Sequence, residues 1–385
     1  MKLSKTLLGL FAALLALSSV VSTQRAAPVL LPKTRPFHMG FTGFPYDFTL
    51  QAQNETYDFI ANHADLITFH QDSGVPWVEA AAGLPFHPNL VAEIDAEVAA
   101  IRPGQKVYVS ATPQNTNRGG ELADYRGSST NLPLPAGWQN RTFDDPEVIA
   151  AYTQWCRYLI ARFQPDYFAY AIECNGGFQN AYEHPFLEFV TLASQVYATL
   201  RAENPNLPIF ITVQADTTNA TREDFLELTG LELLWSDYVG ISSYPFLDLD
   251  YGTIRTIGNP RRIAPDHLFS IAALAPGKPV AITETGYIAE DLDIPAYSIH
   301  GEGREVWQAR YTNSLLWQAA LLNAEFVVWF VPRDYDLGLA RLAVYGIPID
   351  PSFLIWRDNG LLDGAGRARQ SLSVWDAWLS VRHHR

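Results

Sequence analysis

Eight short apolar runs recur along the chain, and each is followed by a polar turn and a segment with helical periodicity. The runs lie at 37–43, 64–71, 106–112, 166–173, 208–215, 237–244, 278–285 and 326–331. Apolar strands that alternate with helices are typical of a parallel sheet covered by helices. Eight such units predict one (β/α)₈ TIM barrel rather than an open doubly wound sheet. We therefore expect a single domain over residues 23–385.

The helical patterns between these runs carry recognisable start signals. They lie at 51–62, 89–101, 146–163, 185–203, 222–234, 265–274 and 304–323, with a closing helix at 371–381. Asp144 or Asp145 precedes Pro146 as a helix cap, and Thr221 stands three residues before Asp224. Two long stretches, 113–145 and 332–370, follow the third and eighth strands. Both are expected on the C-terminal face of the barrel, where active sites are built.

The N-terminal segment has the pattern of a secretory signal peptide. Lys2 and Lys5 precede the apolar core "LLGLFAALLAL", which is too short to span a bilayer, and Val20 and Ser22 offer a cleavage site. We predict a signal peptide over residues 1–22 and a secreted, extracellular protein without membrane association after cleavage. An uncleaved membrane anchor is the alternative. The sequons at Asn54, Asn140 and Asn219 matter only in a host that glycosylates.

Composition and motifs exclude several classes of function. There are 27 Lys and Arg residues against 41 Asp and Glu, a net charge of −14 without basic runs, which argues against nucleic-acid partners. Two cysteines, Cys156 and Cys174, are too few for a disulfide scaffold, and whether they pair is left open. No Cys/His cluster has zinc spacing, and no nucleophile elbow or phosphate loop is present. We expect no metal and no cofactor.

Two strands end in a carboxylate at the same relative position. The fourth run ends in Glu173, before the turn "CNGG", and the seventh ends in Glu284. In a closed barrel these two strand ends face each other obliquely across the mouth. Two carboxyl groups about 5–5.5 Å apart are the machinery of a retaining glycosidase, with one acid and one nucleophile. Like charge and burial are expected to raise the pKa of the acid. The alternative is that each is an ordinary strand-end carboxylate.

Side-chain alternation extends this interpretation into the barrel interior. If Glu173 points inward, so do Ala169 and Ala171, while Tyr170 and Ile172 face the helices. By the same alternation Glu284 points inward together with Val280 and Ile282. Inward parity on the eighth strand would place Val327 and Trp329 inside.

Three segments, "YAIECNGG", "SDYVGISSYPF" and "PVAITETGY", resemble glycoside hydrolase clan A. The last two look most like the family 53 arabinogalactan endo-β-1,4-galactanases. The resemblance implies Glu173 as acid/base and Glu284 as nucleophile of a secreted retaining hydrolase of β-linked glycans, with galactan-like chains as a candidate substrate. It places Tyr244 beside the nucleophile and Trp329 as the platform on which the sugar stacks.

One position departs from the clan pattern. The clan usually has Asn directly before the acid/base Glu, where it bonds the sugar 2-hydroxyl, and here that residue is Ile172. Asn175 is the candidate substitute, and His70 and Gln214, at the ends of strands two and five, are further candidates for substrate contact. The departure favours a second hypothesis, a catalytically weak or inactive carbohydrate-binding barrel. Sugar, linkage, endo or exo action and oligomeric state stay open.

Overall fold

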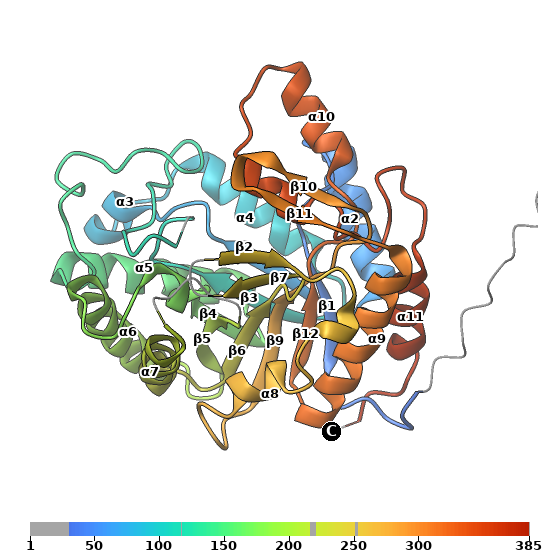
Figure 1. Ribbon diagram of the computed structural model, residues 1–385. Coiled ribbons are helices and arrows are strands. Elements are labelled where there is room, and N and C mark those ends of the chain that lie inside the picture. The colour runs from blue at the N-terminus through green and yellow to red at the C-terminus, as the bar shows by residue number, and fades with distance from the viewer. Residues whose placement is uncertain (1–30, 117, 216–220, 251–252, 385) are drawn as a thin grey trace, which may run out of the picture. The chain divides into compact units, whose positions relative to one another are not determined.

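Eight parallel strands form a closed barrel in the order β1-β12-β9-β6-β5-β4-β3-β2. The computed structural model describes residues 31–116, 118–215, 221–250 and 253–384, and Figure 1 shows the strands surrounded by helices. The barrel strands are β1 (His38–Thr42), β2 (Leu66–Gln71), β3 (Lys106–Ala111), β4 (Tyr167–Ala171), β5 (Ile209–Gln214), β6 (Val239–Ser243), β9 (Val280–Thr285) and β12 (Phe326–Trp329). Each coincides with one of the eight apolar runs, so the predicted (β/α)₈ fold is confirmed.

The helices alternate with these strands as predicted. They are α2 (Leu50–His63), α4 (Pro88–Ala100), α5 (Pro146–Phe163), α6 (His184–Glu203), α7 (Arg222–Glu232), α8 (His267–Ala272), α9 (Glu305–Leu322) and the closing helix α11 (Gln370–Leu379). Asp145 caps α5 by accepting from the Glu147 amide, and Thr221 caps α7 by accepting from the Asp224 amide. The chain therefore begins these two helices where its capping residues predict.

The loops at the C-terminal ends of the strands carry elements that the periodicity did not reveal. They include α3 (Trp77–Ala82), α10 (Asp336–Val344), the hairpin β7 (Leu247–Asp250) with β8 (Thr253–Thr256), and the pair β10 (Leu292–Ile294) with β11 (Ile299–Gly301). Figure 1 shows α10 projecting beyond the barrel beside β10 and β11. These short elements interrupt the stretches that the sequence presents as polar loops.

Aromatic rings fill the lower barrel. The rings of Tyr108 and Phe326 lie 4.9 Å apart, and those of Tyr167 and Phe326 lie 4.8 Å apart, across the interior between strands that are not neighbours. Phe210 packs on Tyr108 at 5.7 Å, and Ala169, Ala281 and Val328 complete the same buried cluster. Because this interior is close-packed, the strand ends above it form a rigid rim on which side chains can be positioned.

A register irregularity changes which residues of β9 point inward. Ile241 of β6 pairs with Ile282, but its successor Ser242 pairs with Glu284, so Thr283 is an extra residue on β9. Such a bulge re-aims the side chains that follow it. Ala281, rather than Val280 or Ile282, belongs to the interior cluster, so the inward assignment of Val280 and Ile282 is wrong. Glu284 reaches the mouth because of the bulge.

Both cysteines are buried free thiols, Cys156 within α5 and Cys174 directly after Glu173. Burial raises the pKa of each thiol above its ordinary value. The Cys174 thiol donates to the Thr212 carbonyl at 3.4 Å. A buried, protonated thiol is a poor nucleophile, so neither cysteine supplies chemistry here.

Candidate active site

Glu173 is held at the barrel mouth by the two strands that follow it. β4 ends at Ala171, Glu173 adopts a left-handed backbone with φ 48°, and its amide donates to Thr212 Oγ1 at 2.8 Å. Its Oε1 accepts from Ser242 Oγ at 2.5 Å, and its Oε2 accepts from Gln214 Nε2 at 3.1 Å. The side chain is 14% exposed, so it is partly open to a ligand while its position is fixed by two donors.

Glu284 stands on the other side of Ser242, which is its strand-pairing neighbour. The Tyr244 hydroxyl donates to Glu284 Oε1, and His70 Nε2 lies 3.2 Å from Oε2. Burial lowers the pKa of His70, so its imidazole is neutral at pH 7 and stacks on Phe44 at 5.9 Å. The structure thus brings the sequence-derived candidates Glu173, Glu284, Tyr244, His70 and Gln214 together at one end of the barrel.

The two carboxyl groups are electrostatically coupled. Burial and then the charge of Glu173 raise the pKa of Glu284 to about 8, while the Tyr244 hydrogen bond and the charge of Arg118 oppose the shift. In the ligand-free protein at pH 7 the coupled pair therefore holds a proton. The sequence predicted a raised pKa at the acid, Glu173; the structure places the raised value on the other carboxyl group.

Trp329 does not line the cleft, and its predicted role as a sugar platform is wrong. The side chain is 0% exposed, its Nε1 donates to the Asn359 carbonyl at 2.9 Å, and its ring lies 6.0 Å from Tyr311 of α9 and 6.4 Å from Trp375 of α11. Phe326 and Val328 are the inward residues of β12, so the assumed parity of Val327 and Trp329 is shifted by one. Trp329 therefore packs between the barrel and helices α9 and α11.

Phe330 takes the place predicted for Trp329. It is half-buried, and its ring lies 6.1 Å from Tyr244, 5.7 Å from Phe44 and 6.1 Å from Trp356. Tyr244 contacts Glu284, and Phe44 stacks on His70, so Phe330 lies within the ring of residues around the nucleophile candidate. An aromatic face here is suited to stack on a sugar ring.

We expect Phe330→Ala to lower kcat/KM about 10- to 100-fold with little effect on Tm, because it removes an apolar contact worth roughly 1.5–3 kcal/mol. Trp329→Phe is the matched control. It should instead lower Tm, because it removes a buried hydrogen bond, and should leave kcat/KM unchanged. Thermal melts and initial rates on the same preparations measure both, and the reverse pattern would restore Trp329 as the platform.

Asn175 is a structural residue, and its predicted contact with substrate is wrong. Its side chain is 0% exposed. The amide oxygen accepts from the Gln214 backbone at 2.7 Å, and the amide nitrogen donates to the Gln214 carbonyl at 3.0 Å and to Thr229 Oγ1 at 3.2 Å. Asn175 therefore ties β5 to α7. Ile172, 2% exposed, offers no donor either, so neither residue supplies a contact to a sugar hydroxyl.

Three polar residues of the site escaped the sequence analysis as site candidates. Ser242 lies within "GISSY", and its place at the C-terminal end of the sixth run was the available signal. Arg118 comes from the long loop after β3, with its Nε 3.6 Å from Glu173 Oε2, and no pattern in that loop marks it. Tyr335 packs on Phe330 at 6.3 Å, and burial followed by the charge of Glu284 raises the pKa of its hydroxyl.

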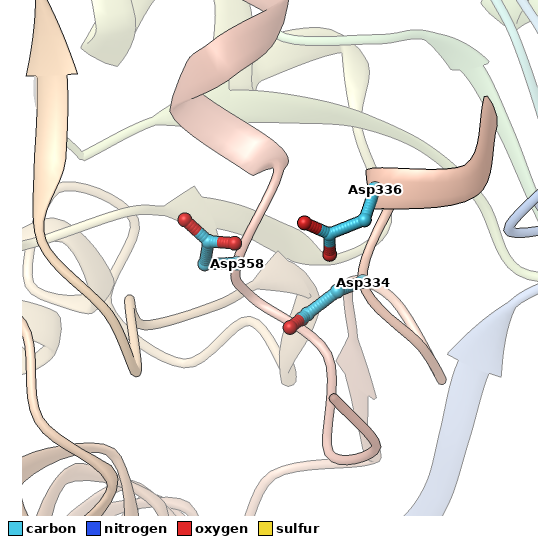
Figure 2. Close-up of side chains that lie close together, drawn as sticks. All are labelled: Asp334, Asp336 and Asp358. Carbon is cyan, nitrogen blue, oxygen red and sulfur yellow. The ribbon is translucent and has the colours of Figure 1, made fainter. Parts of the chain in front are cut away.

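A separate acidic cluster lies in the loop after β12. The carboxylates of Asp334, Asp336 and Asp358 lie within 4.8 Å of one another, and Figure 2 shows them at the start of α10 and on the facing segment. The two buried members are ion-paired, Asp334 with Arg369 and Asp358 with Arg357. The cluster is therefore charge-compensated from within the chain, and it orders this loop.

Comparison with known proteins finds similar folds among solved structures only. No protein-family model matches the sequence, and no curated protein matches it. Solved structures do match: an exo-β-1,4-mannosidase from Opitutaceae bacterium strain TAV5 has a TM-score of 0.60 and 12% identity over 89% of this chain and 59% of that chain. A glycoside hydrolase family 5 subfamily 18 protein from Streptomyces cattleya, in complex with GlcNAc, has a TM-score of 0.61 and 16% identity. The match covers 90% of this chain and 80% of that chain.

A glycoside hydrolase family 53 catalytic domain from Ignisphaera aggregans has a TM-score of 0.55 and 17% identity, covering 93% of this chain and 99% of that chain. The chain has the fold of glycoside hydrolase barrels. The (β/α)₈ chain spans only 59% of the length of the mannosidase. At these identities the likeness concerns the fold, and activity has to be argued from the site itself.

Proposed function

We propose that this protein is a retaining glycoside hydrolase that cleaves β-linked glycans. The observation that carries the proposal is the coupled carboxylate pair Glu173 and Glu284 at the ends of β4 and β9, each held by donors from neighbouring strands. A retaining mechanism requires two carboxyl groups that flank the anomeric carbon. The resemblance to clan A assigns Glu173 as acid/base and Glu284 as nucleophile.

In the first step Glu173 gives its proton to the glycosidic oxygen while Glu284 attacks the anomeric carbon, which breaks the bond to the leaving group. In the second step a water molecule gives a proton to Glu173 and its oxygen displaces Glu284, which releases the sugar. The reactive form therefore has the proton on Glu173 and an ionised Glu284. Tyr244, donating to Oε1, stabilises the ionised form of Glu284 that attacks.

The proton that the carboxyl pair holds sets the alkaline limit of activity. Because the pKa of Glu284 is raised to about 8, the pair keeps one proton below that pH and loses it above. We expect kcat/KM to fall about tenfold per pH unit beyond pH 8, since the doubly ionised pair has no acid. Initial rates from pH 5 to 10 at low substrate concentration measure this fall in kcat/KM. A rate that stays level to pH 10 would show that this pair holds no catalytic proton.

The substrate class follows from the structural neighbours and the sequence resemblance together. An exo-β-1,4-mannosidase shares the fold, and the strand-six and strand-seven segments resemble galactanases. We therefore propose β-mannosides and galactan-like chains as the first substrates to test. The decisive assay incubates the protein with β-mannan, galactan and a panel of other polysaccharides and measures new reducing ends.

A non-catalytic carbohydrate-binding barrel is the second candidate. Ile172 and Asn175 favour it, because neither offers a hydrogen bond to a sugar in the cleft. This candidate predicts binding of a glycan without new reducing ends, so the same panel, read by affinity electrophoresis, discriminates between the two.

We further propose that residues 1–22 are a signal peptide and that the mature, secreted protein is the barrel domain from residue 23. Residues 1–22 lie outside the described part of the chain. Within the described residues, no helix is both long and apolar enough to cross a membrane. Mass spectrometry of the exported protein would give its new N-terminus.

A further inference from the structure

The guanidinium of Arg118 lies between two carboxylates without a hydrogen bond to either. Its Nε is 3.6 Å from Glu173 Oε2, and its Nη2 is 3.9 Å from Asp72 Oδ2, with the side chain 11% exposed. Both separations exceed the N–H···O range. Nε is buried and has no acceptor among the described residues. Nη1 donates to the Asn115 and Thr116 carbonyls at 3.3 and 3.5 Å, so Nε is the buried donor that is left for a partner the chain does not supply.

The loop that carries Arg118 is anchored on the turn that carries Glu173. Asn115 closes the loop, because its carbonyl accepts from the Arg118 amide at 3.0 Å and its Oδ1 accepts from the Gly119 amide at 2.9 Å. A Cβ atom at Gly177 would lie 2.6 Å from the Arg118 carbonyl oxygen, so the two backbones touch. This contact explains a glycine in "CNGG" and fixes the position of Arg118 relative to Glu173.

The charges around Arg118 select the chemistry of the missing partner. Glu173, Asp72 and Glu284 surround one guanidinium and one neutral imidazole, so a second anion would meet net repulsion. A sugar hydroxyl fits, because its oxygen accepts from Nε while its hydrogen is donated to a carboxylate. At 3.6 Å from Glu173 Oε2 and 3.9 Å from Asp72 Oδ2, the guanidinium is hydrogen-bonded to neither carboxylate.

We propose that Arg118 is a substrate-contacting catalytic residue that donates a hydrogen bond to the sugar 2-hydroxyl. The proposal rests on the glycosidase function above, in which the anomeric carbon lies between Glu173 and Glu284. The hydroxyl on the adjacent carbon is then the one within reach of a donor beside Glu173. Hydrogen bonds to this hydroxyl strengthen in the transition state. Arg118 thus supplies, from the loop after β3, the contact that Ile172 and Asn175 do not make.

The test combines a variant with a modified substrate. Arg118→Met and Arg118→Lys are assayed on dinitrophenyl β-galactoside, β-mannoside and β-glucoside and on the 2-deoxy analogues, with Arg141→Met as control. Arg141 lies in the same long loop, is paired with Asp145 and Glu147, and is absent from the contacts of the cleft. We expect Arg118→Met to lower kcat/KM about 10- to 100-fold on the parent glycosides and less than about threefold on the 2-deoxy analogues.

Equal losses on both substrate sets would overturn the proposal and leave Arg118 as an electrostatic neighbour of Glu173. Unchanged rates on the parent glycosides would also overturn it. Arg118→Lys, which keeps the charge without the planar donor set, should recover only part of the parent rate. Thermal melts check that each variant is folded, and Arg118→Lys carries the test if Arg118→Met does not fold.

A binding measurement separates this inference from the proposed function. If the wild type binds mannobiose or galactobiose by calorimetry but cleaves no glycan, the hydrolase function fails. Arg118 is then supported if Arg118→Met weakens Kd about tenfold or more while Arg141→Met does not. Equal affinities for wild type and Arg118→Met would overturn the contact. A wild type that neither cleaves nor binds these sugars overturns both proposals.

Discussion

The Glu284→Gln variant is expected to lose turnover on every glycan that the wild type hydrolyses, by about four orders of magnitude or more. A neutral amide cannot attack the anomeric carbon, so no covalent glycosyl intermediate forms. Gln is nearly isosteric with Glu and retains an oxygen that accepts from the Tyr244 hydroxyl, so the cleft should keep its shape. Initial rates on the polysaccharide that gives the strongest reducing-end signal measure the loss.

Stability data show whether this loss reflects chemistry or misfolding. The pKa of Glu284 is raised from 4.5 to about 8, so its favourable contribution to folding is complete below about pH 4.5 and is lost as pH rises to 8. Glu284→Gln removes this dependence. Its melting temperature should match that of the wild type near pH 4 and exceed it at pH 8–9, by an amount equivalent to a few kcal/mol. A variant that keeps turnover would show that the carboxylate pair is structural.

Glu173→Ala is expected to slow natural glycans about 10²- to 10⁴-fold, because their leaving groups need a proton. Activated aryl glycosides should pass the first step normally, since their leaving groups depart as anions. The second step then lacks its base and the intermediate accumulates. Azide should restore aryl-glycoside turnover, because it attacks the intermediate without base help, and a glycosyl azide of β configuration should be isolated from the mixture.

A matched glutamate outside the cleft controls for loss of charge. Glu188 on α6 has a similarly buried side chain, 11% exposed against 14% for Glu173, and pairs with His184. Glu188→Ala should keep wild-type rates on both substrate classes and show no azide effect. If azide instead rescued Glu284→Ala with a product of retained β configuration, and Glu173→Ala with a product of inverted α configuration, the two assigned roles would be exchanged.

The sequence predicts the architecture well because a parallel barrel has a strong local signature. Strands covered on both sides must be apolar throughout, and amphipathic helices must separate them, so the eight units are visible without knowledge of contacts. The ends of β4 and β9 were also predictable, because a carboxylate directly after an apolar run is a marked exception. Ser242 and Gln214, at equivalent heights on the two strands between them, follow the same logic.

Side-chain direction was less predictable, and bulges are the physical reason. Alternation fails wherever a strand contains an extra residue, and the irregularity of β9 is visible only in its pairings with β6 and β12. On β12, Trp329 and Phe330 are adjacent aromatic residues, and a shift of one residue exchanges their roles. A run without polar residues cannot indicate which of its faces is inside.

Arg118 and Asn175 show a second limit of sequence reasoning. Asn175 has the right chemistry and the right neighbour in sequence, yet its amide group hydrogen-bonds to β5 and α7. Arg118 lies 55 positions before Glu173 and reaches it only because the loop after β3 folds over the turn after β4. Such pairings depend on tertiary packing, which local patterns do not encode.

The backbone contact between Gly177 and Arg118 has a consequence for engineering this barrel. Loops on the catalytic face of a (β/α)₈ barrel are usually exchangeable one at a time, which makes the fold a convenient scaffold for new specificities. Here the loop after β3 and the turn after β4 pack backbone against backbone, since any side chain at position 177 would push the Arg118 backbone away. The two segments therefore cannot be exchanged independently. A library that randomises either segment alone will mostly contain variants in which Arg118 is displaced from Glu173. Transplanting residues 113–121 together with 173–178 keeps the contact between the two segments.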